Sequence, residues 1–463
     1  MSTAEHYDCV VLGSGEPGKY IAWTLGGKLG KKCAVIERKY LGGSCPNIAC
    51  LPSKNVIHSA GVVHDIRQAA SFGVNLQTNA ADIRANMSAV ESRKADMVEG
   101  LRQTHITNFE SAKSEVIFGE GTFVGPKVIE VAGRRLTADT IIINTGSRAF
   151  VDSRIPGLLE SKPLTHVELL DLKELPEHLV ILGGGYIGME FAQAYRRLGS
   201  KVTVIEKHDQ ILAKEDRDVV DALVDIVAGE GVEIITSAKI GSVTGISGAG
   251  VELSVMTGDK SVTVTGSHLL AAAGRTPNTQ NIGLEEAGIE LTPAGHVKVD
   301  EQLKTTVDGV YAVGDCAGSP YFTHIGFDDF RIVLSSLTGS PRHGGVTDRQ
   351  VPSVLFTSHE LAHVGLREHE AQSQGIKYRL GKLPMKAFLR TRTQGDTRGF
   401  AKVLVEADGE RILGFTALGL CTGDLLPVIQ LAMKLGVSYK EISTLVIAHP
   451  TLSEGLIALL NSV

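Results

Sequence analysis

The sequence lacks the features of a membrane protein, a disulfide-rich secreted protein or a nucleic-acid-binding protein. No apolar run approaches the roughly 18 residues that a membrane-spanning helix needs, and the opening stretch MSTAEHYDCVVLGSG has no basic and apolar leader. Six cysteines in 463 residues do not form a disulfide framework. With 46 basic and 52 acidic residues, the net charge of −6 offers no broad basic surface for nucleic acid or membrane. We therefore expect a cytoplasmic protein that binds small molecules site by site.

The length and the glycine content indicate several α/β units. A chain of 463 residues should form about three domains, each able to bury its own core. Glycine, at 52 residues, exceeds its usual level of about 7%. This excess fits many tight turns between strands and helices.

The first of these units has the pattern of a dinucleotide-binding fold. It reads YDCVVLGSGEPGKYIAWTLGGKLGKKCAVIERK, an apolar strand, a glycine-rich turn, a helix and a second strand that ends at Glu37. The glycines of the turn are Gly13, Gly15 and Gly18. They allow backbone N–H groups to approach a pyrophosphate, while the terminal acid can accept a hydrogen bond from a ribose hydroxyl. Glu16 inside the turn would repel a diphosphate, so we expect it to point to solvent.

The stretch GGSCPNIACLPSK, residues 42–54, sets Cys45 and Cys50 five positions apart. On a regular helix this separation turns through roughly 140°, so the two can form a disulfide only if the first helical turn is distorted. Pro46 suits a helix start, and Pro52 disrupts the hydrogen-bond ladder one turn later. A pair held in this way would be reducible. The alternative is two unpaired structural thiols in a reducing compartment.

The rest of the first unit is less specific. Residues 55–105 are polar with heptad-like spacing, and we expect two solvated helices that lie over the first sheet. Strands near 115–131 then lead to IIINTGSRA, where Thr145 and Gly146 close the segment.

A second dinucleotide-binding pattern begins at His178 with HLVILGGGYIGMEFAQAYRRLGSKVTVIEK. Its turn glycines are Gly183, Gly185 and Gly188. Two such units in one chain indicate two dinucleotides, and electron transfer from one to the other. Glu206, at the end of the second strand, would accept the 2′-hydroxyl of NADH and repel the 2′-phosphate of NADPH, so NADH is the predicted donor. The unit ends near Gly274.

The remaining third contains two further candidate sites. A short apolar strand ends at Asp315, at the edge where open parallel sheets bind ligands, although an ordinary aspartate after a buried strand is the alternative. From residue 351 the pattern changes to strands with a hairpin turn at Asp408-Gly409, followed by helices, which predicts an α+β domain with a subunit interface. His449 and Glu454 near the C-terminus form a plausible acid–base pair, with a lone surface histidine as the alternative.

Taken in order, the motifs resemble the FAD-dependent pyridine nucleotide–disulfide reductases over nearly the whole chain. The motifs are GxGxxG…E, GGSCPNIACLPSK, TGS, GGGYIGME…E, GRTPN, AVGD and HPTLSE. HPTLSE is most similar to dihydrolipoamide dehydrogenases, whereas FTHIGFDDFRIV and DTRGFAKVLVE are more similar to the mercuric-reductase-like branch and to bacterial copper(II) reductases. The resemblance implies two Rossmann-like domains and a C-terminal α+β dimerisation domain. The expected boundaries are 1–148 with 272–345 for FAD, 149–271 for NAD(P) and 346–463 for the interface.

The resemblance also implies roles for individual residues. Cys45 would be the interchange thiol that meets substrate, and Cys50 would lie against the flavin as a charge-transfer thiolate. Lys54 and Glu190 would pair beside the isoalloxazine.

Further implied roles concern the flavin's ribitol and the partner subunit. Asp315 would bind the ribitol. His449 with Glu454 would come from the partner subunit as the acid–base pair, which makes a homodimer necessary for activity.

The predicted function is therefore NADH-linked electron exchange, through FAD and the cysteine pair, with a small-molecule disulfide or dithiol. Reduction of Cu(II), Hg(II) or a quinone at the same flavin is an alternative, as is a non-catalytic flavoprotein. The ending ALLNSV lacks the vicinal cysteines of mercuric reductases. Ser358-His359-Glu360 stands where the family commonly has Pro-Glu, a departure from the lipoamide pattern. No resident metal site is predicted.

Overall fold

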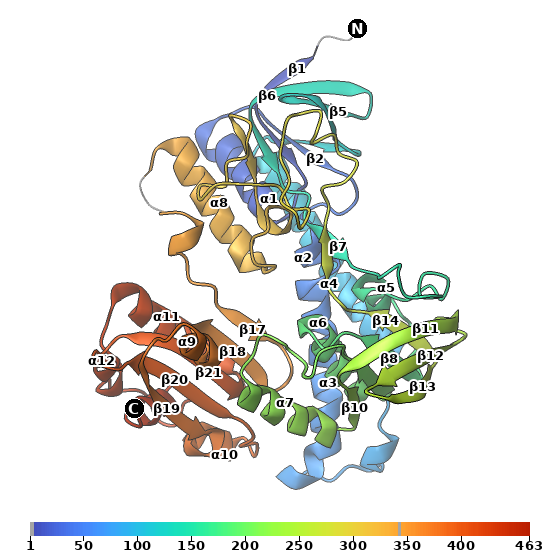
Figure 1. The fold of residues 1–463 in the computed structure, drawn as a ribbon, viewed down its shortest axis with the longest axis vertical. Coiled ribbons are helices and arrows are strands. Elements are labelled where there is room, and N and C mark those ends of the chain that lie inside the picture. Colours follow the sequence, from blue (N-terminus) through green and yellow to red (C-terminus); the bar gives the residue numbers. More distant parts are fainter. Residues whose placement is uncertain (1–3, 341–343) are drawn as a thin grey trace.

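The computed structural model describes residues 4–340 and 344–463. The chain forms three units, and Figure 1 shows the first at the top, the second at the lower right and the C-terminal unit at the lower left. Helices and strands alternate in the first two units, whereas the third is built on an antiparallel sheet. This architecture confirms the predicted fold class of two Rossmann-like units and a C-terminal α+β unit.

The first unit is a sheet with the order β3-β2-β1-β6-β5-β4, in which β16 also pairs with β6. Its strands are β1 (Glu5–Leu12), β2 (Cys33–Glu37), β3 (Glu115–Phe118), β4 (Thr122–Gly125), β5 (Val128–Val131), β6 (Arg134–Ile143) and β16 (Val310–Ala312). The central strands β1, β2 and β6 run parallel and are apolar and buried at their carboxyl ends, as expected for a sheet covered on both faces. The carboxyl ends of β1 and β2 lead into the glycine turn and the cysteine motif.

Two helices cover one face of this sheet. Helix α1 (Glu16–Trp23) begins directly after Gly15 with Pro17 in its first turn, and it continues as a π-helical turn over Thr24–Lys28. Helix α8 (Thr323–Thr338) packs beside α1, and both contribute buried side chains to one hydrophobic core. The N-terminus of α8 is thereby held beside the glycine turn.

Helices α2 (Ser44–Asn47), α3 (Cys50–Gln68) and α4 (Met87–Ser111) follow the cysteine motif, with short 3-10 turns at Ala69–Phe72 and Ala80–Asp82. The prediction that both long helices lie over the first sheet is wrong for α3. Val56 and Ala60 form an apolar stripe on α3 that packs into the core of the second unit. Only the C-terminal part of α4 reaches the first unit, where Phe109 is buried.

The second unit repeats the strand, turn and helix pattern. Its parallel sheet has the order β10-β9-β8-β14, and a separate antiparallel sheet has the order β11-β12-β13. The strands are β8 (His178–Leu182), β9 (Lys201–Ile205), β10 (Val232–Ile235), β11 (Ala238–Ile246), β12 (Gly250–Thr257), β13 (Lys260–Gly266) and β14 (His268–Ala271). The helices are α5 (His166–Leu170), α6 (Tyr186–Leu198) and α7 (Arg217–Gly229).

The chain crosses between the first two units at a pair of short strands. Strand β7 (Ser147–Ala149) leaves the first unit, and β15 (Arg275–Pro277) returns to it, antiparallel to β7. These crossings lie next to the predicted domain boundaries near 148 and 272, and the exact boundaries stay a prediction.

The C-terminal unit is a sheet with the order β17-β18-β21-β20-β19. Its strands are β17 (Ser353–Leu355), β18 (Glu360–Gly365), β19 (Tyr378–Pro384), β20 (Phe400–Glu406) and β21 (Ile412–Gly419). Its helices are α9 (Glu368–Ser373), α10 (Leu389–Thr393), α11 (Leu426–Leu435), α12 (Tyr439–Ser443) and α13 (Gly455–Leu460). Short 3-10 turns lie between these elements at Met385–Ala387 and Thr422–Leu425, and before the first strand of the sheet at Gly314–Ala317 and Val346–Asp348. The predicted hairpin is confirmed, because β20 and β21 pair on either side of Asp408-Gly409.

Of the helices expected after the hairpin, the one over residues 443–460 (STLVIAHPTLSEGLIALL) is wrong over most of its length. Residues 445–454 form no helix, and only α13 is helical in the final stretch. Pro450 lacks the N–H that a helix interior requires, and Val446 is fully exposed. The segment instead projects as a loop that carries His449.

A buried ionic network joins the second and C-terminal units. Lys402 on β20 is fully buried, and its Nζ lies 2.7 Å from Asp216, 2.9 Å from Asp218 and 3.3 Å from Glu368. These carboxylates hold the pKa of the Lys402 ammonium above its ordinary value despite its burial. The network thus ties β20 and α9 of the C-terminal unit to the start of α7 in the second unit.

Within residues 4–340 and 344–463, no helix is long and apolar enough to cross a membrane.

Candidate active site

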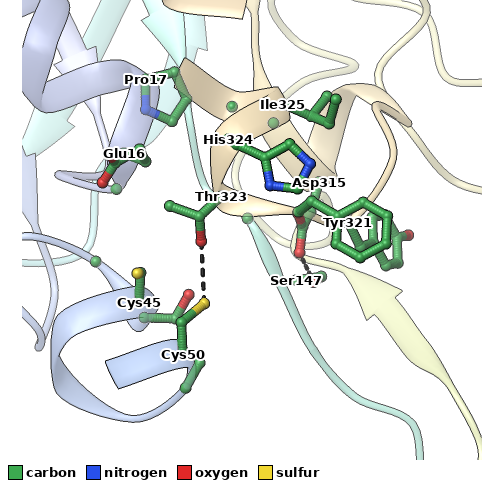
Figure 2. A pocket seen from close by; sticks show the side chains of 18 of the residues that line it. Glu16, Pro17, Cys45, Cys50, Ser147, Asp315, Tyr321, Thr323, His324 and Ile325 are labelled. Atoms are coloured by element: carbon green, nitrogen blue, oxygen red, sulfur yellow. Dashed lines mark hydrogen bonds between the residues drawn. The ribbon is translucent and has the colours of Figure 1, made fainter. Parts of the chain in front are cut away.

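All three units border one large cleft of about 2110 Å³. The residues that line it come from distant parts of the sequence. They lie within the stretches 12–17, 36–40, 43–54, 144–149, 165–170, 186–191, 314–328 and 423–434, with further residues between these stretches. Figure 2 shows the part of the cleft where the cysteine motif faces α8 and Asp315. The cleft therefore collects most of the residues that the sequence motifs single out.

The cysteine pair lies at a break between two helices. Helix α2 ends at Asn47 and α3 starts at Cys50, while Ile48 and Ala49 have φ of −140° and −132°. Asn47 Nδ2 donates to the carbonyls of Gly43 (2.7 Å) and Leu41 (2.9 Å) and so holds the turn. This break confirms the predicted distortion, and it places both cysteine side chains below Thr323 in Figure 2.

The two thiols differ sharply in acidity. The pKa of Cys50 is lowered to about 6, chiefly because Cys50 accepts a hydrogen bond from Cys45. Burial raises this pKa, whereas the hydrogen bond with Thr323 and the charge of Lys54 lower it further. The pKa of Cys45 is raised, because Cys45 donates to Cys50, is buried and lies near Glu16. Both cysteines are free thiols. The pair can therefore hold one thiolate near neutral pH, and Cys50 is its site.

An ion pair lies next to Cys50 on the adjoining helices. Lys54 Nζ, on α3, lies 2.7 Å from Glu190 Oε2, on α6. The other carboxylate oxygen of Glu190 accepts the backbone N–H of Phe356 at 3.0 Å, and the ammonium lies 4.7 Å from the centre of the Phe356 ring. The pair is thus fixed from three units at once.

The first glycine turn fits a dinucleotide. A Cβ at Gly13 would lie 2.3 Å from the carbonyl oxygen of Asn144, and one at Gly18 would lie 2.4 Å from its Nδ2. Only glycine allows this close packing, which leaves the N-terminus of α1 open toward the cleft. Glu37 accepts hydrogen bonds from the backbone N–H (3.0 Å) and the hydroxyl (2.6 Å) of Ser14. Its other carboxylate oxygen accepts the backbone N–H groups of Lys39 (2.9 Å) and Tyr40 (3.0 Å), so a ribose hydroxyl would have to share one of these acceptors.

The prediction that Glu16 points to solvent is wrong. Its carboxylate lies 2.7 Å from Lys19 Nζ, and the side chain is only 19% exposed. Lys19 is itself buried and lies 3.0 Å from His105 Nε2. The ammonium compensates the charge of Glu16, so this acid can lie in the wall of a phosphate-binding cleft. The separation of three residues on one helix was the signal for this pair in the sequence.

The predicted residues at the ends of β6 and β16 lie together in the cleft wall. Asp315 accepts a hydrogen bond from Ser147 Oγ, and Arg275 Nε lies 3.6 Å from the same carboxylate. Thr145 accepts a hydrogen bond at its carbonyl from Asn278 Nδ2 at 2.9 Å. Gly146 has φ of +66°, and a Cβ there would meet open space.

The second glycine turn also fits a dinucleotide. A Cβ atom at Gly183 would lie 2.6 Å from a backbone oxygen, and a Cβ atom at Gly188 would lie 2.0 Å from another. At Gly185 a Cβ atom would meet no other atom within 4 Å. Glu206 is buried, and it accepts the backbone N–H groups of Gly184 (2.7 Å) and His208 (2.9 Å). Gly274, with φ of +135°, lies where the chain returns to the first unit.

His449 does not meet the cysteines within one subunit. Its Nδ1 lies 2.9 Å from Glu454, so the predicted pair forms, but the histidine is 62% exposed. Neither residue is among those that line the cleft. An acid–base role for His449 at Cys45 therefore requires a second copy of the chain.

Thr323 is the residue of this site that sequence reasoning missed. It belongs to FTHIGFDDFRIV, which predicted only a helix, and nothing local to that stretch indicates that its hydroxyl meets a cysteine far away in the sequence.

Among the residues that the structure describes, no group of three or more His, Cys, Asp or Glu side chains could hold a metal ion.

Comparisons with known proteins cover almost the whole chain. Residues 7–329 match the family described as pyridine nucleotide-disulphide oxidoreductase, and residues 351–459 match its dimerisation domain. The dihydrolipoyl dehydrogenase of Thermus scotoductus is 33% identical over 97% of this chain and 96% of its own. The probable pyridine nucleotide-disulfide oxidoreductase RclA of Escherichia coli is 33% identical over 97% of this chain and 98% of its own.

Solved structures agree with these matches. The Cu(II) complex of the HOCl-induced flavoprotein disulfide reductase RclA from Escherichia coli has a TM-score of 0.88, with 32% identity over 99% of each chain. LpdA from Mycobacterium tuberculosis has a TM-score of 0.87, with 26% identity over 98% of this chain and 99% of its own. The dimerisation-domain match supports a homodimer. The disulfide interpretation therefore holds over the metal-ion or quinone alternative, and the chain belongs to the class I pyridine nucleotide-disulphide oxidoreductase family as an FAD-dependent enzyme that uses a pyridine nucleotide.

Proposed function

We propose that the enzyme reduces a small-molecule disulfide with NADH, or oxidises the corresponding dithiol, through Cys45 and Cys50. The observation that carries this proposal is the placement of both thiols at a helix break in the shared cleft, with the Lys54–Glu190 ion pair beside Cys50. The lowered pKa of Cys50 and the raised pKa of Cys45 fit the same division of roles, because one sulfur of a redox pair must remain a thiolate while the other exchanges with substrate.

The chemistry follows from this division between the sulfurs. Bound FAD would take a hydride from the nicotinamide and supply the electron pair that opens the Cys45–Cys50 disulfide. The Cys45 thiolate then attacks a substrate sulfur, the substrate S–S bond breaks, and the leaving thiolate takes a proton. Cys50 next attacks Cys45, which restores the disulfide and releases the second substrate thiolate. One NADH and one proton thus convert one disulfide into two thiols.

His449 of the partner subunit is the proposed donor and acceptor of the proton. In its own subunit it is exposed and already oriented by Glu454, which leaves Nε2 free for exchange with a thiol. The exposed loop that carries it and the exposed Leu431, Leu435 and Val446 of the same unit suit an interface between two copies. The homodimer is then required for disulfide exchange.

The remaining residues would hold the two dinucleotides. Gly13, Gly15, Gly18 and Glu37 would receive the FAD diphosphate and ribose, with Thr145, Gly146 and Asp315 further along the same cleft. Lys54 and Glu190 would adjoin the ring system. Gly183, Gly185, Gly188 and Glu206 would receive NADH, near the return of the chain at Gly274. The close-packed glycines and the ordered carboxylates support these assignments.

A panel of acceptors tests the proposed substrate class. NADH oxidation should be followed with lipoamide, glutathione disulfide, Cu(II), Hg(II) and a quinone, for the wild type and for Cys45→Ser. We expect at least one disulfide to be turned over by the wild type and none by Cys45→Ser. Cys421→Ser is the matched control, because Cys421 is a free cysteine exposed in the C-terminal unit. Disulfide turnover that survives Cys45→Ser would overturn the proposal.

A further inference from the structure

Thr323 touches the more acidic thiol of the pair. Its Oγ1 lies 3.1 Å from Cys50 Sγ, within hydrogen-bond distance for sulfur, as the dashed line in Figure 2 shows. A thiolate carries no proton and can only accept, so in the ionised pair the hydroxyl must be the donor. The hydrogen bond therefore favours the charged form of Cys50 over the neutral form.

The backbone around Thr323 supports the same charge. Thr323 is the first residue of the 16-residue helix α8, and the residue before it is extended, with φ of −128°. Thr323, His324 and Ile325 all line the cleft. The partial positive charge at this helix terminus thus lies on the side of the thiolate.

Contacts of Asp329 and His324 hold the first turns of α8, which carry Thr323. Asp329 is fully buried in α8 and accepts hydrogen bonds from the N–H of Gly314 (2.7 Å) and from Ser319 Oγ (2.8 Å). His324 Nε2 makes a hydrogen bond to the carbonyl of Pro352 at 2.8 Å, which turns this imidazole away from the sulfurs. The backbone that carries the donor is thus already in place when the thiolate forms.

The other groups that face the pair act by charge or by their own titration. They are Cys45 from α2, Lys54 from α3, Glu190 from α6 and Glu16 from α1. Lys54 favours the Cys50 thiolate, but Glu190 lies 2.7 Å from that ammonium and opposes it. Cys45 stops being a donor once it ionises to attack substrate. The Thr323 hydroxyl remains through the whole cycle.

We propose that Thr323 is a catalytic hydrogen-bond donor that holds Cys50 as a thiolate from the opening of the Cys45–Cys50 disulfide until Cys50 attacks Cys45. This inference rests on the proposed function of the pair. It assigns to α8 a role in the chemistry of the cysteines, in addition to its packing against α1. The hydroxyl keeps Cys50 ionised during the interval in which Cys45 is occupied by substrate.

The test is a pH titration of Cys50 in the Cys45→Ser background, where one thiol of the pair remains. The holoenzyme is read at long wavelength, where a thiolate against oxidised flavin absorbs, and near 240 nm, where thiolates absorb directly. Thr323→Val, Thr323→Ser and Thr338→Val are compared in that background. Thr338 lies at the far end of α8 and donates to the carbonyl of Leu334, so it is the matched control.

We expect Thr323→Val to raise the midpoint by about 1 to 2 pH units, the usual effect of losing a hydrogen bond to a charged group. Thr323→Ser and Thr338→Val should leave it unchanged. An unchanged midpoint in Thr323→Val, or an equal shift in Thr323→Ser, would overturn the inference. Absence of the long-wavelength band in every variant would instead overturn the proposed role of Cys50. The 240 nm titration would still report on the hydrogen bond in that case.

Discussion

The carboxylate of Glu206 should determine the choice between NADH and NADPH. It lies at the end of β9, is buried, and is held by the backbone N–H groups of Gly184 and His208 at 2.7 and 2.9 Å. A 2′-phosphate of charge about −2 placed about 4 Å away would be repelled by about 2 kcal/mol even with the dielectric constant of water. That energy corresponds to a preference for NADH of about 30-fold.

The substitution Glu206→Gln removes this charge and keeps the shape of the side chain. We expect the ratio of kcat/KM for NADH to kcat/KM for NADPH to fall by about 10- to 100-fold, chiefly because NADPH improves. Glu233→Gln is the matched control, because Glu233 lies on the adjacent strand β10 and accepts a hydrogen bond from Thr203 at 2.9 Å. A wild type that prefers NADPH, or a ratio unchanged in Glu206→Gln, would refute the reasoning.

Two further predictions concern the proton donor and the joint between units. His449→Ala should slow disulfide exchange by roughly 10² to 10⁴-fold in single-turnover kinetics. The rate with acceptors that take electrons directly from reduced flavin should be nearly unchanged. An equal loss of rate with both kinds of acceptor would contradict an acid–base role. Lys402→Met should lower the free energy of unfolding by about 3 to 5 kcal/mol in a urea titration, because it leaves the buried carboxylate of Asp216 without its ammonium partner. Lys382→Met, which removes a partly exposed partner of Asp218, should change it by less than about 1 kcal/mol, and equal effects would contradict the importance of burial.

The parts of the fold that were predictable from the sequence are those with a local cause. Both glycine turns need a strand before them and a helix after them, and the close approach at Gly13 and Gly183 excludes any other residue. The distortion between Cys45 and Cys50 follows from their spacing and the nearby prolines. These features are encoded within about 35 residues each, in the pattern of one strand, turn and helix unit.

The parts that were not predictable depend on partners distant in the sequence. The packing of α3 on the second unit is a choice between two apolar surfaces, and its polar composition gave no means of choosing. Glu16 is an exception, because its ion pair with Lys19 joins residues three positions apart on one helix and was predictable from the sequence. The contact of Thr323 with Cys50 joins residues 273 positions apart, which no periodicity can show.

The most direct test of the division of labour in the pair is the absorbance spectrum of the two cysteine variants. Cys45→Ser should keep a long-wavelength band from a Cys50 thiolate against oxidised flavin, because Thr323 and the charge of Lys54 still lower the pKa of Cys50, and that band should fade at acid pH as Cys50 takes up a proton. Cys50→Ser should have no such band at any pH. A band that vanishes in Cys45→Ser and survives in Cys50→Ser would contradict the assignment of the two thiols.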